Sequence, residues 1–360
     1  MSAATNRLPG MPAFESPFFG RPGFAPPIRP ENLPVAQALR ENGYAVVDFP
    51  DPDFAARAAA IRADLDPRYD WAEWRASGFA RGDGLRIQDA WTFNDDVKAI
   101  ACNPALLALL SDLFGRQAQP FQTLNFPVGT QQHFHSDAAH FNSRPERFMC
   151  GVWVALEDIE ADAGPLVYYP GTHTWPVFDN EHLGTTALGR RNVGLYGQLW
   201  SDLVTAHGLS PERFLARKGQ ALIWAANILH GGDRQTNPDR TRWSQVTHYF
   251  FEDCAYYTPF YSDPFSGSIA WREPVDIRTR APMVNRVGGQ PVDAAFIEES
   301  SERSGRLLAG ESAAIASRVA ALRQEVAYHS GRVDRLKSSL SWRITAPIRG
   351  VGRLLKTKRA

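Results

Sequence analysis

The chain of 360 residues has little cysteine and lacks any long apolar run. Its three cysteines, Cys102, Cys150 and Cys254, have no spacing typical of a metal site and cannot all pair with one another, so we expect reduced, mostly buried thiols. No stretch of about 18 or more uncharged apolar residues is present, and the N-terminus lacks the charged start and apolar core of a secretory signal. These absences predict neither a membrane span nor a secreted scaffold, and they indicate a cytoplasmic protein.

Net charge is also absent, but the neutral total hides two regions of opposite sign. Residues 301–360 hold 13 Lys and Arg against 4 Asp and Glu, a net of +9, which leaves a net of −9 for the first 300 residues. Over 335–360 apolar and basic side chains alternate, which is typical of attachment to an anionic membrane surface at the inner face of the membrane. No nucleic-acid partner is expected, because no recognised module accompanies the charge.

Apolar residues in the same tail recur at alternating spacings of four and three over 315–340. This pattern predicts a short coiled coil, through which the chain would form a homo-oligomer or dock onto a partner helix. A single amphipathic helix that lies on its own domain is the alternative.

Two histidines and one aspartate form the most informative pattern of the chain. His135 and Asp137 lie two residues apart, and His230 follows far downstream. Residues two apart on an extended segment point to the same side, so His135 and Asp137 can converge on one ion while the third ligand comes from another strand. Two imidazoles and a carboxylate on one face of iron(II) leave three adjacent positions for O2 and a chelating co-substrate. A histidine in the core or at the surface is the simpler interpretation of the tripeptide taken alone.

A carboxylate clamp is predicted downstream of His230. Residues 241–250 are rich in β-forming side chains, so Arg242 and Ser244 would share one face of a strand with Val246 and His248. A guanidinium offers a planar fork of donors and the hydroxyl adds one more, which suits a buried dicarboxylate.

Together these segments resemble the phytanoyl-CoA dioxygenase family of iron(II)/2-oxoglutarate oxygenases, over roughly residues 35–260. Five segments in the same order as in the family carry the resemblance. Residues 122–137 resemble the iron-binding strand, and residues 151–158 and 164–173 resemble the two strands of the next hairpin. The other two are residues 218–224, before His230, and the Arg-x-Ser strand after it. The resemblance implies a double-stranded β-helix (jelly-roll, cupin-like) core, mainly β with flanking helices, followed by a helical C-terminal tail.

The resemblance also implies a role for each site residue. His135, Asp137 and His230 would bind Fe(II), and Arg242, assisted by Ser244, would bind the distal carboxylate of 2-oxoglutarate. Trp153 falls where the family places an aromatic wall beside the co-substrate, and His133, taken to share a strand face with His135, would donate to the co-substrate or support the ligands. Some members have a hydroxyl residue two positions after the distal histidine, where this chain has Gly232.

The implied reaction consumes 2-oxoglutarate and O2, releases succinate and CO2, and hydroxylates a small-molecule, lipid or glycan-precursor substrate. Two alternatives stay open: a non-catalytic cupin-like scaffold that binds a ligand at the membrane surface, and an iron oxygenase that takes no 2-oxoglutarate. Residues 338–349 also resemble a C-terminal motif of bacterial enzymes of surface-polysaccharide assembly, which suggests where to look for substrates.

Four regions are expected along the chain. A Pro- and Phe-rich extended arm covers 1–34, and the oxygenase domain covers 35–260, with a helix over 33–43, a strand over 44–49 and outer helices over 52–66 and 96–115. The segment 173–218 interrupts the β pattern and is predicted to form a lid over the mouth. Residues 170–173 are predicted to form a turn between strands, in which His173 has an architectural role. An irregular connection over 261–300 leads to the basic helical tail, 301–360.

Overall fold

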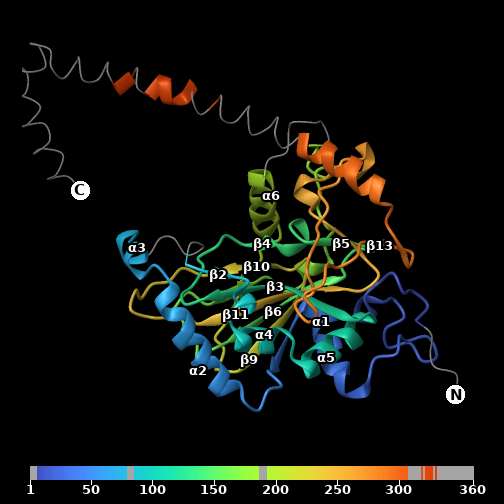
Figure 1. Cartoon of the computed structure of the whole chain (residues 1–360), viewed down its shortest axis with the longest axis horizontal. Helices are drawn as coiled ribbons and strands as arrows, with labels where there is room; N and C mark the ends of the chain where they lie inside the picture. The colour runs from blue at the N-terminus through green and yellow to red at the C-terminus, as the bar shows by residue number, and fades with distance from the viewer. Residues whose placement is uncertain are drawn as a thin grey trace, which may run out of the picture. The chain divides into compact units, whose positions relative to one another are not determined.

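Two antiparallel sheets form the body of the computed structural model, which describes residues 6–78, 85–185 and 193–306 together with 318, 321–326 and 329–330 (Figure 1). The larger sheet has six strands in the order β1 (Tyr44–Asp48), β9 (Gln220–Ala225), β6 (Met149–Ala155), β11 (Ser244–Phe251), β3 (Ala118–Phe126) and β2 (Ile87–Gln88). The smaller has four strands in the order β4 (His135–Ser136), β10 (Leu229–Gly232), β7 (Leu166–Tyr168) and β8 (Glu212–Phe214). The expected fold class, mainly β with a jelly-roll core and flanking helices, is confirmed.

Alternating side chains of the six-stranded sheet divide the core into two layers. On β6, Val152 and Val154 belong to the core that includes the outer helices, whereas Trp153 between them belongs to the core that includes β7 and β8. A strand buried on both faces reads as a continuous apolar run, as residues 149–155 do. The two segments expected as a hairpin, β6 and β7, lie in different sheets, because β7 pairs with β10 and β8.

The outer face of the six-stranded sheet is covered by α2 (Phe54–Leu65), α4 (Asp95–Ala101) and α5 (Pro104–Phe114), whose buried side chains join the same core. The helix expected over 96–115 is therefore two helices. The Asn103 side chain accepts a hydrogen bond from the Leu106 backbone N–H and Pro104 follows at the first helical position, which together start a new helix. Residues Asp95–Phe114 have the length and hydropathy of a membrane span, but their apolar faces lie in this core.

The first described residues pack on this layer through aromatic side chains. Within the arm are the single turns η1 (Ala13–Glu15) and η2 (Pro30–Asn32). Phe14 is buried edge-on against Phe114, with ring centroids 5.2 Å apart. Helix α1 (Leu33–Asn42) then ends at Gly43, whose φ of 83° is the left-handed conformation that glycine adopts at no steric cost. The chain continues directly into β1, so the expected helix and strand at this position are confirmed.

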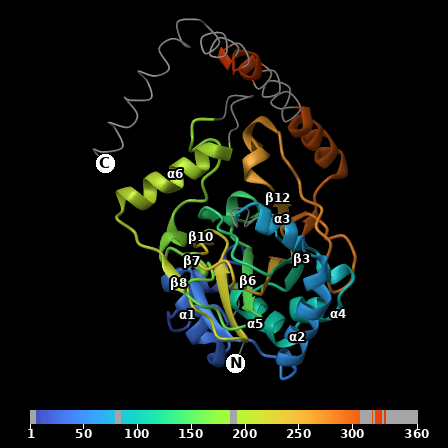
Figure 2. The same ribbon diagram turned by 90° about the vertical axis from the view of Figure 1, so that its left-hand side faces the viewer.

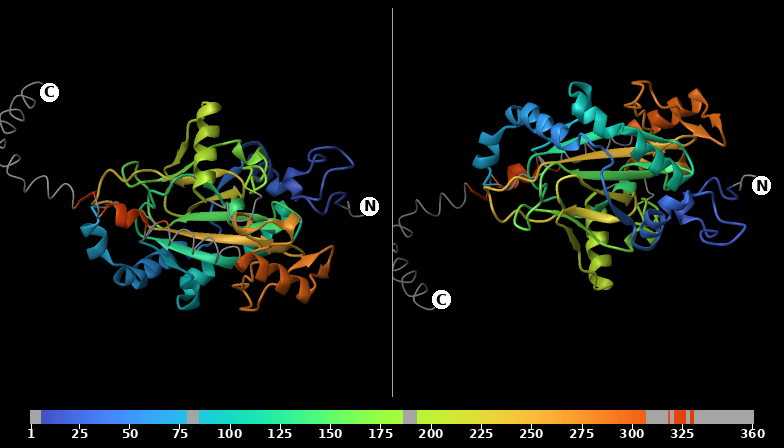
Figure 3. Two further views of the ribbon diagram at one scale, coloured as in Figure 1. Left: turned by 90° about the horizontal axis from the view of Figure 1, so that it is seen from above. Right: turned by 90° about the horizontal axis from the view of Figure 1, so that it is seen from below.

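Residues 173–218 contain η7 (Thr172–Thr174), α6 (Val193–Ala206) and β8. Helix α6 stands on the opposite side of the strands from α2, α4 and α5 (Figures 2 and 3). It packs through Tyr196 and Trp200 on Leu229 of β10 and on Phe260. The role of this segment as a lid stays a prediction.

Residues 255–305 pack on the body of the same compact unit, which extends to Gly305. Strand β12 (Ala255–Tyr257) pairs with β5 (Asn142–Arg144), and β13 (Arg286–Val287) pairs with β14 (Gln290–Pro291). The stretch expected as an irregular connection has little regular structure, yet Ile277 and Met283 are buried in the main core, and residues 294–306 are helical.

Most of the tail lies outside the described residues. Residues 318, 321–326 and 329–330 are helical, with Leu322 and Val326 exposed. The predicted seam over 315–340 is described only at these positions and the membrane-binding segment over 335–360 not at all, so both stay predictions.

Candidate metal centre

Two strands and a single helical turn bring His135, Asp137 and His230 together. His135 lies on β4 and His230 on β10, directly opposite it in the antiparallel register. Asp137 begins the turn η6 (Asp137–Ala139) instead of continuing the strand as expected, but its side chain still converges with that of His135. One ligand atom from each of the three residues lies within 4.8 Å of the other two. The sequence spacing and the fold thus agree on one candidate ion site.

Backbone carbonyls orient both imidazoles. The Nδ1 of His135 lies 3.0 Å from the carbonyl oxygen of His133, and the Nδ1 of His230 lies 3.1 Å from that of Ile228. A carbonyl only accepts hydrogen bonds, so each Nδ1 carries a proton, and in the neutral form of each ring Nε2 keeps its lone pair. Both Nε2 atoms lie 3.6 Å from a carboxylate oxygen of Asp137. This is the tautomer that a metal-binding histidine requires.

The carboxylate of Asp137 is held from a third side. The indole N–H of Trp224 donates to Oδ2 over 2.8 Å, and the Nε2 of His248 lies 3.6 Å from the same oxygen. Burial raises the pKa of Asp137, but the surrounding imidazoles outweigh it and hold the pKa well below its ordinary value. Burial lowers the pKa of His230 to about 4. At neutral pH the site therefore offers an ionised carboxylate and a neutral imidazole to a cation.

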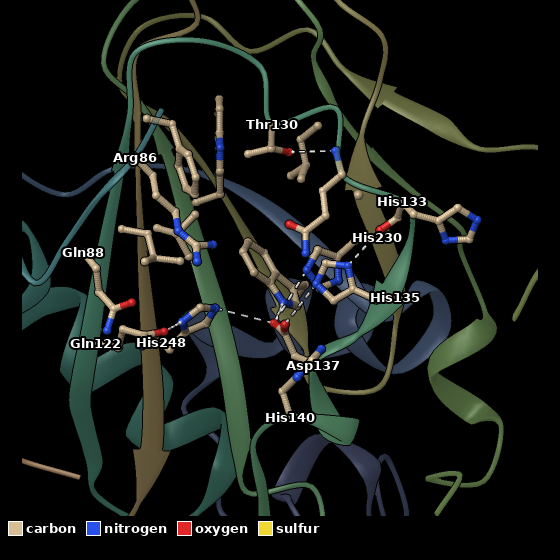
Figure 4. Close-up of a pocket in the computed structure, with 18 of the residues that line it drawn as sticks. Arg86, Gln88, Gln122, Thr130, His133, His135, Asp137, His140, His230 and His248 are labelled. Atoms are coloured by element: carbon tan, nitrogen blue, oxygen red, sulfur yellow. Dashed lines mark hydrogen bonds and ion pairs between the residues drawn. The ribbon is translucent and has the colours of Figure 1, made fainter. Parts of the chain in front are cut away.

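A cavity of 570 Å³ opens beside these side chains, between the two sheets (Figure 4). The inner face of the six-stranded sheet forms its floor, because Trp153, Val246 and Leu124 stand in register on β6, β11 and β3. The apolar side chains of the lining are Leu124, Phe126, Phe141, Trp153, Leu166, Trp224 and Val246. Its polar side chains are Arg86, Gln88, Gln122, Thr130, Gln131, Gln132, His133, His135, Asp137, His140, His230, Arg242 and His248.

Three buried polar atoms in this region have no hydrogen-bond partner among the described residues. They are the Nε of Arg242, the Ser244 hydroxyl and the Trp153 indole nitrogen. Arg242 is 1% exposed, and its Nη2 makes a long hydrogen bond of 3.4 Å to the carbonyl oxygen of Val128. The guanidinium carbon of Arg242 lies 5.6 Å from the Trp153 ring centroid. Burial lowers the pKa of Arg242 to about 10, so the side chain stays cationic at neutral pH.

His133 does not lie where the sequence pattern predicts. Its ring points away from the triad (Figure 4) and is exposed, with Nδ1 2.9 Å from the Phe134 carbonyl oxygen and Nε2 3.4 Å from the Ser201 hydroxyl of α6. The alternation of strand residues fails here because β4 begins only at His135. Gly232, at the position of the family's hydroxyl residue, has no room for a side chain, since a Cβ there would collide with Thr130 and with the backbone of Gln131.

Sequence reasoning missed four side chains of this site. His248 shares the predicted strand face with Arg242 and Ser244, and that alternation alone aims it at the same cavity, although the sequence pattern assigns it no role. No sequence pattern assigns a functional role to Trp224, Arg86 or His140.

His173 has the architectural role that was expected of it. The side chain is buried and does not line the cavity, and its Nε2 lies 3.1 Å from the Arg40 carbonyl oxygen of α1. The contact ties the turn after β7 to the first helix of the domain.

The family model described as phytanoyl-CoA dioxygenase (PhyH) matches residues 39–243. The chain belongs to the phytanoyl-CoA dioxygenase family. The enzyme class and the cofactors that the sequence led us to expect, a non-heme iron dioxygenase that uses iron(II) and 2-oxoglutarate, are those of this family.

Individual relatives are distant. Rat peroxisomal phytanoyl-CoA dioxygenase is 26% identical over 129 residues, which are 35% of this chain and 36% of that enzyme, so the chain matches only about a third of the relative's length. Among solved structures, the epimerase SnoN in complex with Fe3+, alpha ketoglutarate and nogalamycin RO is 20% identical and has a TM-score of 0.49, covering 71% of this chain and 96% of its own. EctD from S. alaskensis with bound Fe is 18% identical and has a TM-score of 0.48, covering 78% and 92%.

Proposed function

We propose that this protein is an iron(II)/2-oxoglutarate-dependent dioxygenase that hydroxylates a small-molecule substrate. The observation that carries the proposal is the pairing of a two-histidine, one-carboxylate cluster with a buried arginine that has no acidic partner among the described residues, both on one cavity. Either feature alone would suit several kinds of protein. Their combination suits a cation and a dicarboxylate that bind side by side.

His135, Asp137 and His230 would hold the iron. The two Nε2 lone pairs and one carboxylate supply three ligands, and the hydrogen bonds from each Nδ1 to a backbone carbonyl fix the rings before the ion arrives. The Trp224 indole does the same for Asp137. A centre with three protein ligands leaves positions for a chelating co-substrate and for O2, in contrast to a closed structural site.

Arg242, Ser244 and Trp153 would hold 2-oxoglutarate. A buried guanidinium without a counter-ion costs free energy, and a carboxylate removes that cost. The Ser244 hydroxyl and the Trp153 indole N–H add two neutral donors, neither of which has another partner among the described residues. The fit is therefore to an acidic ligand that reaches deep into the cavity, as a dicarboxylate does when its other end lies at the metal.

Iron(II) with 2-oxoglutarate and O2 would supply the oxidation, in which the co-substrate becomes succinate and CO2 and one oxygen atom enters a C–H bond of the substrate. The chain's own part is to position the groups and to exclude water. Phe126, Trp153 and Leu166 make the deep part of the cavity apolar, which keeps water from the reacting atoms.

The proposal is tested by adding iron(II) and then 2-oxoglutarate to the purified protein without oxygen and recording the weak visible charge-transfer band of the chelated pair. We expect the band in the wild type and its loss in both His135→Ala and Arg242→Ala. A chelator competition assay separates the two losses: His135→Ala should bind iron poorly, whereas Arg242→Ala should bind it as the wild type does.

Arg217→Gln is the matched control for the arginine variant. It removes an exposed positive charge outside the cavity and should keep the band. No band in folded, iron-loaded wild type would favour the ligand-binding scaffold. Turnover that persists in Arg242→Ala would favour an iron oxygenase that takes no 2-oxoglutarate.

We further propose that the basic tail attaches the enzyme to an anionic membrane surface and that 315–340 pairs with a second helix. The support is the charge and the apolar spacing of the sequence. Sedimentation with lipid vesicles and light scattering of the full chain test the two statements separately.

A further inference from the structure

We propose that the substrate is an anionic small molecule whose carboxylate or phosphate group is bound by Arg86 at the mouth of the cavity. This inference rests on the proposed function and narrows its substrate class. It concerns a second arginine of the cavity, distinct from the deeply buried Arg242.

The edge strand of the six-stranded sheet aims Arg86 at the cavity. Arg86 directly precedes this edge strand, β2, in which Ile87 pairs with Asn125 of β3 and Gln88 pairs with Leu124 of β3. Side chains two apart on a strand share a face, so Arg86 and Gln88 lie on the same side as Leu124, which lines the cavity. Figure 4 shows the Arg86 side chain turned inward, on the wall that also carries Gln122 and His248.

No acidic side chain among the described residues neutralises Arg86. Its side chain makes no ion pair or hydrogen bond there, in contrast to Arg57, which joins Asp51 and Asp96. Among the described residues the acid nearest in sequence is Asp89, and it is committed elsewhere: its Oδ1 accepts from the Thr123 backbone N–H over 3.1 Å and from the Trp91 indole over 3.1 Å. A guanidinium keeps its charge at any ordinary pH, so the positive charge at the mouth is permanent.

When iron(II) and 2-oxoglutarate are bound, the formal charges in the cavity sum to zero before Arg86 is counted. Among the described residues, Asp137, Arg86 and Arg242 are the only Asp, Glu, Lys or Arg side chains that line the cavity. Iron(II) and 2-oxoglutarate contribute +2 and −2, and Asp137 and Arg242 contribute −1 and +1, so these four cancel. Arg86 is exposed, so its charge of +1 lies where an anionic substrate that enters from solvent can reach it.

The surroundings of Arg86 also have room and donors for such a group. The Oε1 of Gln122 accepts from the Nδ1 of His248 over 3.0 Å, which leaves the amide N–H groups of Gln122 as further donors on the same wall. A second cavity of 280 Å³ shares Arg86 with the first, and its lining includes Tyr69 and Trp74 as well as the charged side chains of Arg68, Asp70 and Glu73. A substrate held at Arg86 can therefore place one part at the iron and extend another over these aromatic rings.

A series of four probes with the same butyl chain tests the proposal: butyrate, butyl phosphate, butanol and butylamine. Each is titrated calorimetrically, without oxygen, into the full chain loaded with iron(II) and saturating 2-oxoglutarate, so that Arg242 is already occupied. We expect the wild type to bind at least one anion about tenfold more tightly than the alcohol and the amine, because a charge-assisted pair contributes roughly that factor. The stronger of the two anions identifies carboxylate or phosphate as the recognised group.

Substitutions at Arg86 assign this preference to one side chain. Arg86→Gln should remove it, Arg86→Lys should keep part of it because the charge remains without the fork, and Arg217→Gln should keep it fully. The proposal is overturned if Arg86→Gln retains the preference, if the neutral probe binds the wild type as tightly as the anions, or if no probe binds. The visible band, recorded in the same samples, distinguishes failure of the proposed function from failure of the Arg86 proposal. A wild type without the band contradicts the proposed function, whereas a band without anion preference contradicts only the role of Arg86.

Discussion

Replacing Trp224 by phenylalanine tests whether the indole N–H prepares Asp137 for the metal. The indole donates to the Asp137 Oδ2 over 2.8 Å, and both side chains are almost fully buried. Phenylalanine retains an aromatic ring among the same apolar neighbours but removes the donor. The carboxylate would then lose a neutral hydrogen-bond donor that fixes its orientation between His135 and His230.

Two effects of similar size are expected, one on stability and one on metal affinity. A hydrogen bond to a charged acceptor contributes about 1.5–3 kcal/mol, so the free energy of unfolding should fall by up to that amount even without metal. Loss of a partner that orients a metal ligand typically weakens metal affinity about 10- to 100-fold, or roughly 1.4–2.7 kcal/mol. The metal affinity falls because the carboxylate must be reoriented when the ion binds.

The assay is an anaerobic iron(II) titration against a competing chelator, together with urea unfolding of the metal-free protein. Trp153→Phe is the matched control: it removes a buried indole N–H from the neighbouring strand, but that N–H has no partner among the described residues and so does not bond to Asp137. We expect Trp153→Phe to bind iron as the wild type does. Wild-type iron affinity in Trp224→Phe would refute the reasoning, whatever the change in stability.

Three further predictions concern packing, thiols and the tail. Gly151→Ala would put a Cβ into the Trp224 indole, so we expect a loss of about 1–3 kcal/mol in urea unfolding and weaker iron binding; unchanged values would contradict the close packing. Burial raises the pKa of Cys102 to about 11 and of Cys254 to about 12, so both thiols stay protonated at pH 8, and mass spectrometry should find them unmodified by iodoacetamide until urea is added. Deletion of residues 331–360 should abolish sedimentation with anionic vesicles and preserve the visible band; vesicle binding that survives the deletion would argue against the tail as the attachment site.

The sequence predicted those parts of the site that depend on local spacing and residue chemistry. His135 and Asp137 converge because they are two residues apart at the end of an extended segment, and Arg242 and Ser244 are both buried beside the cavity because they lie at the start of one strand. The fold class followed from the ordered resemblance of five segments, and it agrees with apolar runs such as 149–155, which are typical of strands buried on both faces.

The sequence did not predict features that depend on where chain segments meet in space. His133 was misplaced because the extended segment begins only at His135, which no pattern between residues 127 and 134 signals. The bond from Trp224 to Asp137 joins residues 87 positions apart, and its room is provided by Gly151 on a third strand. Such a contact follows from sheet register, which is set by the whole set of pairings and not by any one segment.

The strand pairings also determine where the metal would lie relative to the two sheets. Both histidines of the cluster come from the four-stranded sheet, on the directly opposed positions of β4 and β10. Asp137, the third residue that would hold the ion, contacts Trp224 and His248 of the six-stranded sheet, so the ion would lie between the two sheets, beside the inner face of the larger one. That inner face carries Trp153 on β6 and Ser244, Val246 and His248 at alternate positions of β11, with Arg242 two residues before β11 begins. An acidic co-substrate bound to the ion would thus extend from one sheet to the other, and the edge strand with Arg86 would border the space left for the substrate.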